Sequence, residues 1–276
     1  MMNSTTGSPL HPQPRAGRIL GIRAVLAVGC VLGALTIPAA QAQEAASPTA
    51  NDGDKVIVLI NPNSNARTTE SMTEIAAKET EGIAKVEGRS NEGVPPLLTT
   101  PEDLQKAIPG VVKIGVEAAR DDRVAAIIIA AFGDPALEEL RAEVDVPVFG
   151  IREEAFHEAA RGGRPFGIAT TTPDPGLLES FRQTAAALGY EDLFRGTRAT
   201  PGDPNELMQA SPDKLDAALA EAVRSSVEED GAQAVIIGGG PLTASALRLQ
   251  PQFDIPLVVP VIAAARAAVK EVTDGN

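Results

Sequence analysis

Tryptophan is absent from this sequence, and aromatic residues of any kind are scarce. Only 3% of the 276 residues are aromatic, with one tyrosine and seven phenylalanines. Proteins that stack on nucleic-acid bases use aromatic side chains for that contact, so the composition argues against a surface of this kind. The 43% of hydrophobic residues is ample for a core, in which aliphatic side chains and alanine must dominate.

Cysteine is almost absent as well. Its one occurrence is Cys30, inside an N-terminal segment that we expect to be removed. The mature chain would then have no thiol. This excludes disulfides, zinc-thiolate sites and cysteine nucleophiles together.

Residues 1–42 lack acidic side chains and have the pattern of a secretory signal peptide. Three arginines are their only charges, and an apolar run from Ala24 to Ile37 precedes a small-residue triplet that ends at Ala42. This order predicts cleavage after Ala42 and export, to the periplasm, with no membrane attachment afterwards. The apolar run is short for a bilayer span. Two alternatives stay open: an uncleaved anchor, and lipid attachment at Cys30.

Positive charge is also in short supply. Loss of the three arginines of the signal changes the net charge from −13 to −16. Proteins that bind nucleic acids neutralise phosphates with lysine and arginine, so we expect no nucleic-acid partner. An anionic ligand would need a locally favourable site.

What the sequence does contain is a regular alternation of apolar runs with amphipathic segments. It begins near Lys55, after a polar tether at 43–54. Continuous apolar strands separated by helices predict an α/β fold with mainly parallel sheets covered by helices on both faces. The predicted strands are 56–60, 125–130, 146–151, 166–170, 234–238 and 255–259.

Four helix starts are marked by a capping residue followed by proline. Such a pair places the cap just before the first helical position. The pairs are Thr100-Pro101, Asp134-Pro135, Asp174-Pro175 and Ser211-Pro212.

The chain also looks duplicated, because AIIIAAFGDPAL aligns with AVIIGGGPLTAS and VIVLINPNS aligns with FGIATTTPD. The two halves predict two pseudo-symmetric lobes, residues 55–150 and 151–260, with the C-terminal helix 261–272 packing on the first. Ligands of open α/β sheets bind at the carboxyl ends of the strands. We therefore expect one cleft between the lobes, surrounded by Asn61, Ala131, Thr170 and Gly239.

Five segments together resemble the aspartate/glutamate/hydantoin racemase superfamily, most closely its hydantoin racemase branch. They are INPNSNARTTESM, AAFGDPAL, VPVFGIREEAFH, GIATTT and IIGGGPLTASA, and the resemblance covers roughly Lys55 to Val272. It implies a ligand between the two lobes, no cofactor, and two cysteines that exchange protons with opposite faces of the substrate Cα. The positions that match those cysteines hold Ala131 and Gly239, and Val259-Pro260 replaces a family Asp-Gly pair.

Neither alanine nor glycine exchanges protons, so two-thiol racemisation and single-thiol decarboxylation are both disfavoured. The apparatus for binding a small carboxylate or amino-acid derivative remains, because amide, hydroxyl and backbone N–H donors at strand ends suit an anion. A turn or capping role is the alternative for each of these residues. The candidates are Asn61, Asn63, Ser64, Thr170, Thr171, Gly239 and Gly240.

Substitutes for the missing acid and base are few. Glu153 and His157 lie four residues apart on a predicted helix and are weak catalytic candidates. A lone histidine is more often structural, and no second ligand accompanies it for a metal site. Asp134 is an alternative base, although an aspartate before proline usually caps a helix.

The glycine run 238–240 raises a separate possibility. A glycine-rich turn after a strand can hold phosphate, but this run breaks the dinucleotide fingerprint and lacks the lysine of a P-loop. Two functions therefore compete: an enzyme of the superfamily that transfers protons by a non-thiol route, and a non-catalytic periplasmic binder of a small carboxylate. Both functions are compatible with a homo-oligomer.

Overall fold

The computed structural model describes residues 55–274, which fall within one compact unit of the chain. The predicted signal peptide at 1–42, with Cys30, and the predicted tether at 43–54 lie outside the described residues. Within the described part, no helix is both long and apolar enough to cross a membrane.

Two four-stranded sheets form the framework, and every strand pair in them is parallel, as predicted. The first sheet has the order β2-β1-β3-β4 and the second β6-β5-β7-β8, so the halves share one topology. The strands are β1 Val56–Asn61, β2 Lys85–Ser90, β3 Val124–Ile129, β4 Val148–Gly150, β5 Phe166–Thr170, β6 Phe194–Ala199, β7 Ala234–Ile237 and β8 Leu257–Val258.

Two of these strands were missed by the sequence analysis. β2 has the sequence KVEGRS and β6 has FRGTRA, and most of their residues are partly or fully exposed. Each occupies an edge of its sheet, where polar and charged side chains are tolerated. An apolar-run criterion finds only the buried strands.

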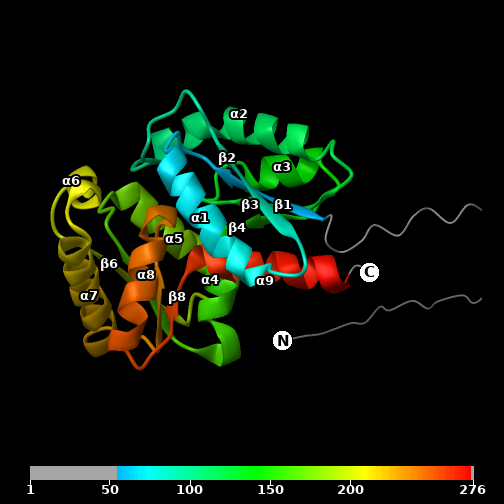
Figure 1. The fold of residues 1–276 in the computed structure, drawn as a ribbon. Coiled ribbons are helices and arrows are strands. Elements are labelled where there is room, and N and C mark those ends of the chain that lie inside the picture. Colours follow the sequence, from blue (N-terminus) through cyan, green and yellow to red (C-terminus); the bar gives the residue numbers. More distant parts are fainter. Residues whose placement is uncertain (1–54, 275–276) are drawn as a thin grey trace, which may run out of the picture. The chain divides into compact units, whose positions relative to one another are not determined.

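Nine α-helices cover the sheets in the described part (Figure 1). They are α1 Ala66–Glu79, α2 Pro101–Ala118, α3 Leu137–Glu143, α4 Ile151–Ala159, α5 Pro175–Ala187, α6 Pro204–Gln209, α7 Pro212–Glu228, α8 Thr243–Leu249 and α9 Pro260–Asp274. Three predicted caps are confirmed: Thr100, Asp174 and Ser211 each accept a hydrogen bond from the first turn of α2, α5 and α7.

The fourth predicted cap is wrong. Asp134 does not cap a helix that starts at Pro135, because α3 begins at Leu137 after Ala136 in a left-handed conformation. The Asp134 carboxylate instead accepts hydrogen bonds from the peptide N–H groups of Arg152 and Glu153, both at 2.9 Å. It therefore caps α4, which follows the neighbouring strand β4.

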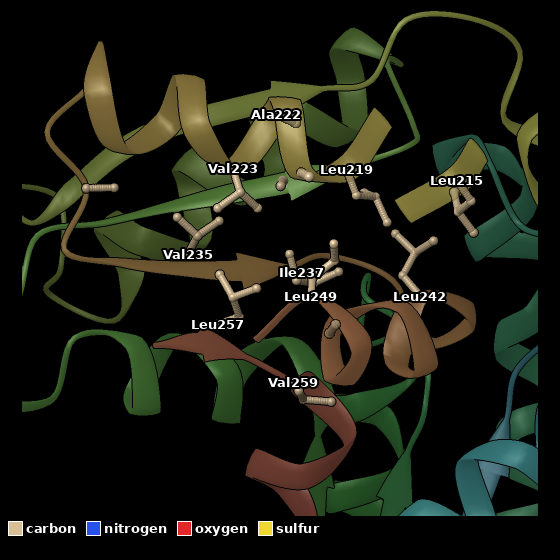
Figure 2. Packing of buried hydrophobic residues seen from close by; sticks show 14 of the residues in the cluster. Leu215, Leu219, Ala222, Val223, Val235, Ile237, Leu242, Leu249, Leu257 and Val259 are labelled. Carbon is tan, nitrogen blue, oxygen red and sulfur yellow. The ribbon is translucent and has the colours of Figure 1, made fainter. Parts of the chain in front are cut away.

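The helix that follows the last strand of each half packs on the other half. Residues of α9 share a buried cluster with β1, β3 and α1, and residues of α4 share one with β5, β7 and α5. The remaining faces are covered by α2 with α3 in the first lobe and by α7 with α8 in the second. Figure 2 shows this last cluster, in which Leu219 and Val223 of α7 face Val235 and Ile237 of β7.

Candidate functional site

A cavity of about 70 Å³ lies where the strand ends of the two lobes meet. The first lobe contributes Asn63 after β1 and residues 130–133 after β3, and the second contributes residues 170–172 and 238–242 after β5 and β7. Ala131 and Gly239, the positions that the resemblance is expected to match to the two family cysteines, both line this cavity.

Most of the cavity wall is apolar, and sequence reasoning missed it. These side chains come from the loop before α2, from α2, α5 and the short helix α6, and from the segments that follow β3 and β7. In the sequence they are indistinguishable from core residues of the same helices. The apolar wall consists of Leu97, Leu98, Leu104, Phe132, Leu177, Phe181, Met208 and Leu242.

None of the described residues that line the cavity carries an ionisable side chain. Its polar side chains are those of Asn63 and of three consecutive threonines, Thr170, Thr171 and Thr172. A ligand here meets amide, hydroxyl and backbone groups within an apolar surround. Such a site holds no group that takes up or releases a proton near neutral pH.

The predicted binding residues of the first lobe divide into two sets. Asn63 lines the cavity, whereas Asn61 and Ser64 do not. Asn61 is fully buried, and its Nδ2 donates to Asn63 Oδ1 at 2.8 Å and to Thr69 Oγ1 at 2.9 Å. The peptide N–H of Ser64 donates to the carbonyl of Pro95 at 3.4 Å. Asn61 thus lies beneath the cavity wall.

The predicted binding residues of the second lobe, Thr170, Thr171, Gly239 and Gly240, all line the cavity. The Thr170 hydroxyl donates to the carbonyl of Gly238 at 2.8 Å and accepts from the Thr172 N–H at 3.3 Å. Gly240 starts a 3-10 turn, Gly240–Leu242. Pro241 has no N–H, and the Leu242 N–H donates to the Gly239 carbonyl at 3.0 Å. The Gly240 N–H is the donor that this turn offers to a ligand oxygen.

Gly239 has a backbone conformation that suits glycine, with φ 156° and ψ 128°. A Cβ placed there would lie 3.2 Å from Leu242 Cδ1 and 3.3 Å from Leu242 Cγ. A cysteine in this backbone conformation would therefore be strained, and its Cβ would be crowded by Leu242.

The structure does not place Glu153 and His157 at this cavity, since neither is among the residues that line it. Glu153 pairs with Arg141, with Nη1 to Oε2 at 3.0 Å, and lies 3.9 Å from His157 Nε2. His157 Nδ1 is 2.8 Å from the Tyr190 hydroxyl. His157 lowers the pKa of Glu153, as does Arg141, and Glu153 raises the pKa of His157. These two weak catalytic candidates therefore lie outside the cavity.

Glu153, Glu154 and His157 also bring three potential metal-ligand atoms within 4.8 Å of one another. The Arg141 guanidinium donates a hydrogen bond to Glu153, so one of the two carboxylates of the cluster already has a cationic partner. Asp134, the other candidate base, has its carboxylate turned to the first turn of α4. Burial raises its pKa to about 6, against the opposing effect of Arg152 and the two N–H donors.

Comparisons with known proteins agree with the fold. A family model described as Asp/Glu/hydantoin racemase matches residues 57–268. A hydantoin racemase from Paenarthrobacter aurescens is 28% identical over 217 residues, which cover 77% of this chain and 89% of the relative.

Two solved structures of similar fold are both named as allantoin racemases. The one from Klebsiella pneumoniae has a TM-score of 0.74 at 26% identity, over 80% of this chain and 89% of that chain. The one from Pseudomonas fluorescens has a TM-score of 0.72 at 22% identity, over 80% of this chain and 92% of that chain, which supports the shared fold.

Proposed function

Because this chain belongs to the Asp/Glu/hydantoin racemase family, we propose that its inter-lobe cavity binds a small molecule like those its relatives act on, without transferring a proton. Family membership confirms the resemblance stated from the sequence motifs. The candidate ligands are hydantoins and related ureides, since the relatives are named hydantoin and allantoin racemases, and small carboxylates with an apolar substituent.

One observation carries the proposal: the cavity keeps donors and apolar walls but has no ionisable side chain among its described residues. Racemisation at Cα needs one group to remove a proton and another to return it from the opposite face. Ala131 and Gly239 stand at the two strand ends where such groups would act, and neither side chain exchanges a proton. Binding needs only the groups that remain.

The polar and apolar parts of the cavity suit different parts of such a ligand. A carbonyl or carboxylate oxygen can accept hydrogen bonds from Asn63, Thr171 and the N–H group of Gly240. A substituent such as isopropyl or benzyl can contact Leu104, Phe181 and the rest of the apolar wall. A second ionised group would be buried without a partner, which is costly, so dicarboxylates and zwitterions should bind poorly.

The test is a binding and exchange experiment on the purified protein. Substituted hydantoins, allantoin, amino acids and arylmalonates are titrated by calorimetry, and the same mixtures in D2O are followed by NMR for deuterium at Cα. We expect saturable binding of at least one neutral or monocarboxylate ligand, with exchange no faster than in buffer. Exchange above buffer that disappears in Glu153→Gln or His157→Asn would overturn the proposal in favour of a non-thiol enzyme.

A cavity-filling variant locates the binding. Ala131→Leu places a larger side chain in the cavity, so it should abolish binding while the protein stays folded. Leu247→Ala, at a side chain that is 42% exposed on α8, is the matched control and should bind as the wild type does. Equal binding by all three proteins would place the ligand elsewhere.

The signal-peptide pattern of residues 1–42 adds an expected location to this proposal. We propose that the binder acts after export, with its N-terminus at Gln43. N-terminal sequencing of the protein from fractionated cells tests this, and an intact Met1 in the cytoplasmic fraction contradicts it.

A further inference from the structure

Two buried asparagines close to the end of β1 have different surroundings: Asn63 lines the cavity and Asn61 does not. We propose that Asn61 is a positioning residue, which fixes the Asn63 amide with its Nδ2 toward the cavity. The first lobe then offers a ligand a hydrogen-bond donor and selects an acceptor oxygen. The ligand part of this inference rests on the proposed function, whereas the orientation of the amide does not.

The contacts of Asn63 leave its amide one orientation. Its Oδ1 accepts from Asn61 Nδ2 at 2.8 Å and from the Asn65 N–H at 2.9 Å. An amide oxygen has two lone pairs, so both are taken. If the amide were reversed, its NH₂ would face two donors. The NH₂ group is the half that remains for the cavity.

Asn61 is held just as firmly. Its Nδ2 also donates to Thr69 Oγ1 at 2.9 Å and lies 3.3 Å from the Asn65 carbonyl, and its Oδ1 accepts from the Asn63 N–H at 3.2 Å. Reversal would turn an oxygen toward the Asn65 carbonyl and toward Asn63 Oδ1. Buried polar groups without partners are costly, so the network favours the observed arrangement.

Thr69 connects this network to the neighbouring strand. Its hydroxyl donates to the Asn65 carbonyl at 3.1 Å and lies 2.6 Å from Ser90 Oγ at the end of β2. The orientation of Asn63 is thus anchored to α1 and to two strands of the first sheet, rather than to the loop alone. In the second lobe the Thr170 hydroxyl already donates to the Gly238 carbonyl, which leaves the Thr171 and Thr172 hydroxyls and the backbone as donors there.

The orientation can be tested without any ligand. In the ¹⁵N-labelled protein, the side-chain NH₂ signals are assigned with Asn61→Ala and Asn63→Ala, and their exchange with solvent is measured. The Asn61 NH₂ should be protected by its three acceptors, and the Asn63 NH₂ should exchange faster. The reverse order of protection would overturn the inference.

The effect on binding is tested with 5-isopropylhydantoin as the probe. Asn61→Ala should weaken binding by about tenfold, because it frees the Asn63 amide to rotate. Asn63→Asp keeps an oxygen for both network donors but replaces the cavity donor with an acceptor, so it should weaken binding at least as much. Asn91→Ala is the matched control: it removes another buried amide, which donates to the carbonyls of Pro62 and Ala107, and should bind within twofold of the wild type.

The outcomes separate the two proposals. Wild-type binding by Asn63→Asp, or equal weakening by Asn61→Ala and Asn91→Ala, would overturn the positioning role. If Asn61→Ala fails to fold, the exchange measurement and Asn63→Asp still decide. If the wild type binds none of the ligand panel, the proposed function fails, and the exchange measurement alone decides the inference.

Discussion

At the scale of single residues, Ala131 and Gly239, which the resemblance is expected to match to the family cysteines, differ in how readily they would accept a cysteine. Ala131 differs from cysteine by one sulfur atom, and its backbone is not among those with positive φ. Gly239 has φ 156°, a backbone conformation that cysteine rarely adopts. A Cβ at this position would also lie only 3.2 Å from Leu242 Cδ1. Restoration of a thiol at 239 therefore requires the local chain to move.

This difference predicts unequal costs for the two substitutions. Ala131→Cys should change the free energy of unfolding by less than about 0.5 kcal/mol, because it adds one atom at a cavity wall. Gly239→Cys should lower it by about 1–3 kcal/mol through backbone strain. Urea unfolding measures both. Gly239→Ala is the control, since a Cβ without a thiol should account for most of the loss.

The sequence was sufficient to predict which residues line the cavity where the end of a buried strand alone determines their place. Asn63, Thr170 and Gly239 follow buried strands, and all three line the cavity. It failed to separate Asn61 from Asn63, because side-chain direction at a turn depends on hydrogen bonds to Thr69 and Asn65 that no local pattern reveals. The apolar wall escaped for a similar reason: its leucines and phenylalanines have the spacing of ordinary core residues.

At the scale of elements, Asp134 joins the β3 loop, which forms part of the cavity wall, to the first turn of α4. The Asp-Pro pattern correctly predicted that Asp134 caps a helix, but it assigned the cap to the wrong helix. The reason is spatial: β3 and β4 are paired neighbours, so the loop after one lies beside the helix that follows the other. Local sequence records a capping residue but not which helix it reaches.

The buried carboxyl of Asp134 predicts a pH dependence of stability. Its pKa is raised from 3.8 to about 6 by burial, so the folded state holds the proton more tightly than the unfolded state. The stabilisation is complete below about pH 4 and is lost as the pH rises through about 6, a change on the order of 3 kcal/mol. Asp134→Asn cannot titrate and should lack this dependence.

Thermal or urea unfolding from about pH 4 to about pH 8 measures the effect as the difference between the wild type and Asp134→Asn. The advantage of the wild type should shrink as the pH rises. Asp174→Asn, at the cap of α5, is the control: it measures how far the loss of a capping carboxylate changes the free energy of unfolding. A wild-type advantage that instead grows with pH would mean that Arg152 and the two N–H donors outweigh burial.

At the scale of the whole described region, the two halves share a topology and exchange their last helices. The duplication could be predicted from aligned strand segments, since the same apolar run and turn recur. The placement of the two last helices on the opposite lobes is implied by the predicted bounds, because residues 151–260 include α4 and the helix 261–272 is assigned to the first lobe. Packing settles it: Ala264 and Ala268 of α9 contact the first lobe, and Ala155 and Phe156 of α4 contact the second.

This exchange predicts that the lobes unfold together. Tyr190, the one tyrosine in the sequence, packs against His157 of α4 and Phe166 of β5, so its fluorescence reports the second lobe. Ile57→Val, in the buried first-lobe cluster, should lower the free energy of unfolding by about 1 kcal/mol. Ile236→Val makes the same change within the second-lobe cluster. The two variants should lower the urea midpoint reported by Tyr190 fluorescence by equal amounts.

Urea unfolding followed by Tyr190 fluorescence and by far-UV circular dichroism provides the comparison. The two signals should coincide in the wild type and in both variants, since a helix of each half completes the core of the other and neither core survives alone. A Tyr190 midpoint that stays fixed in Ile57→Val, with a separate earlier step in the circular dichroism, would show lobes that fold independently. In that case the cavity between them would depend on lobe docking rather than on one shared core.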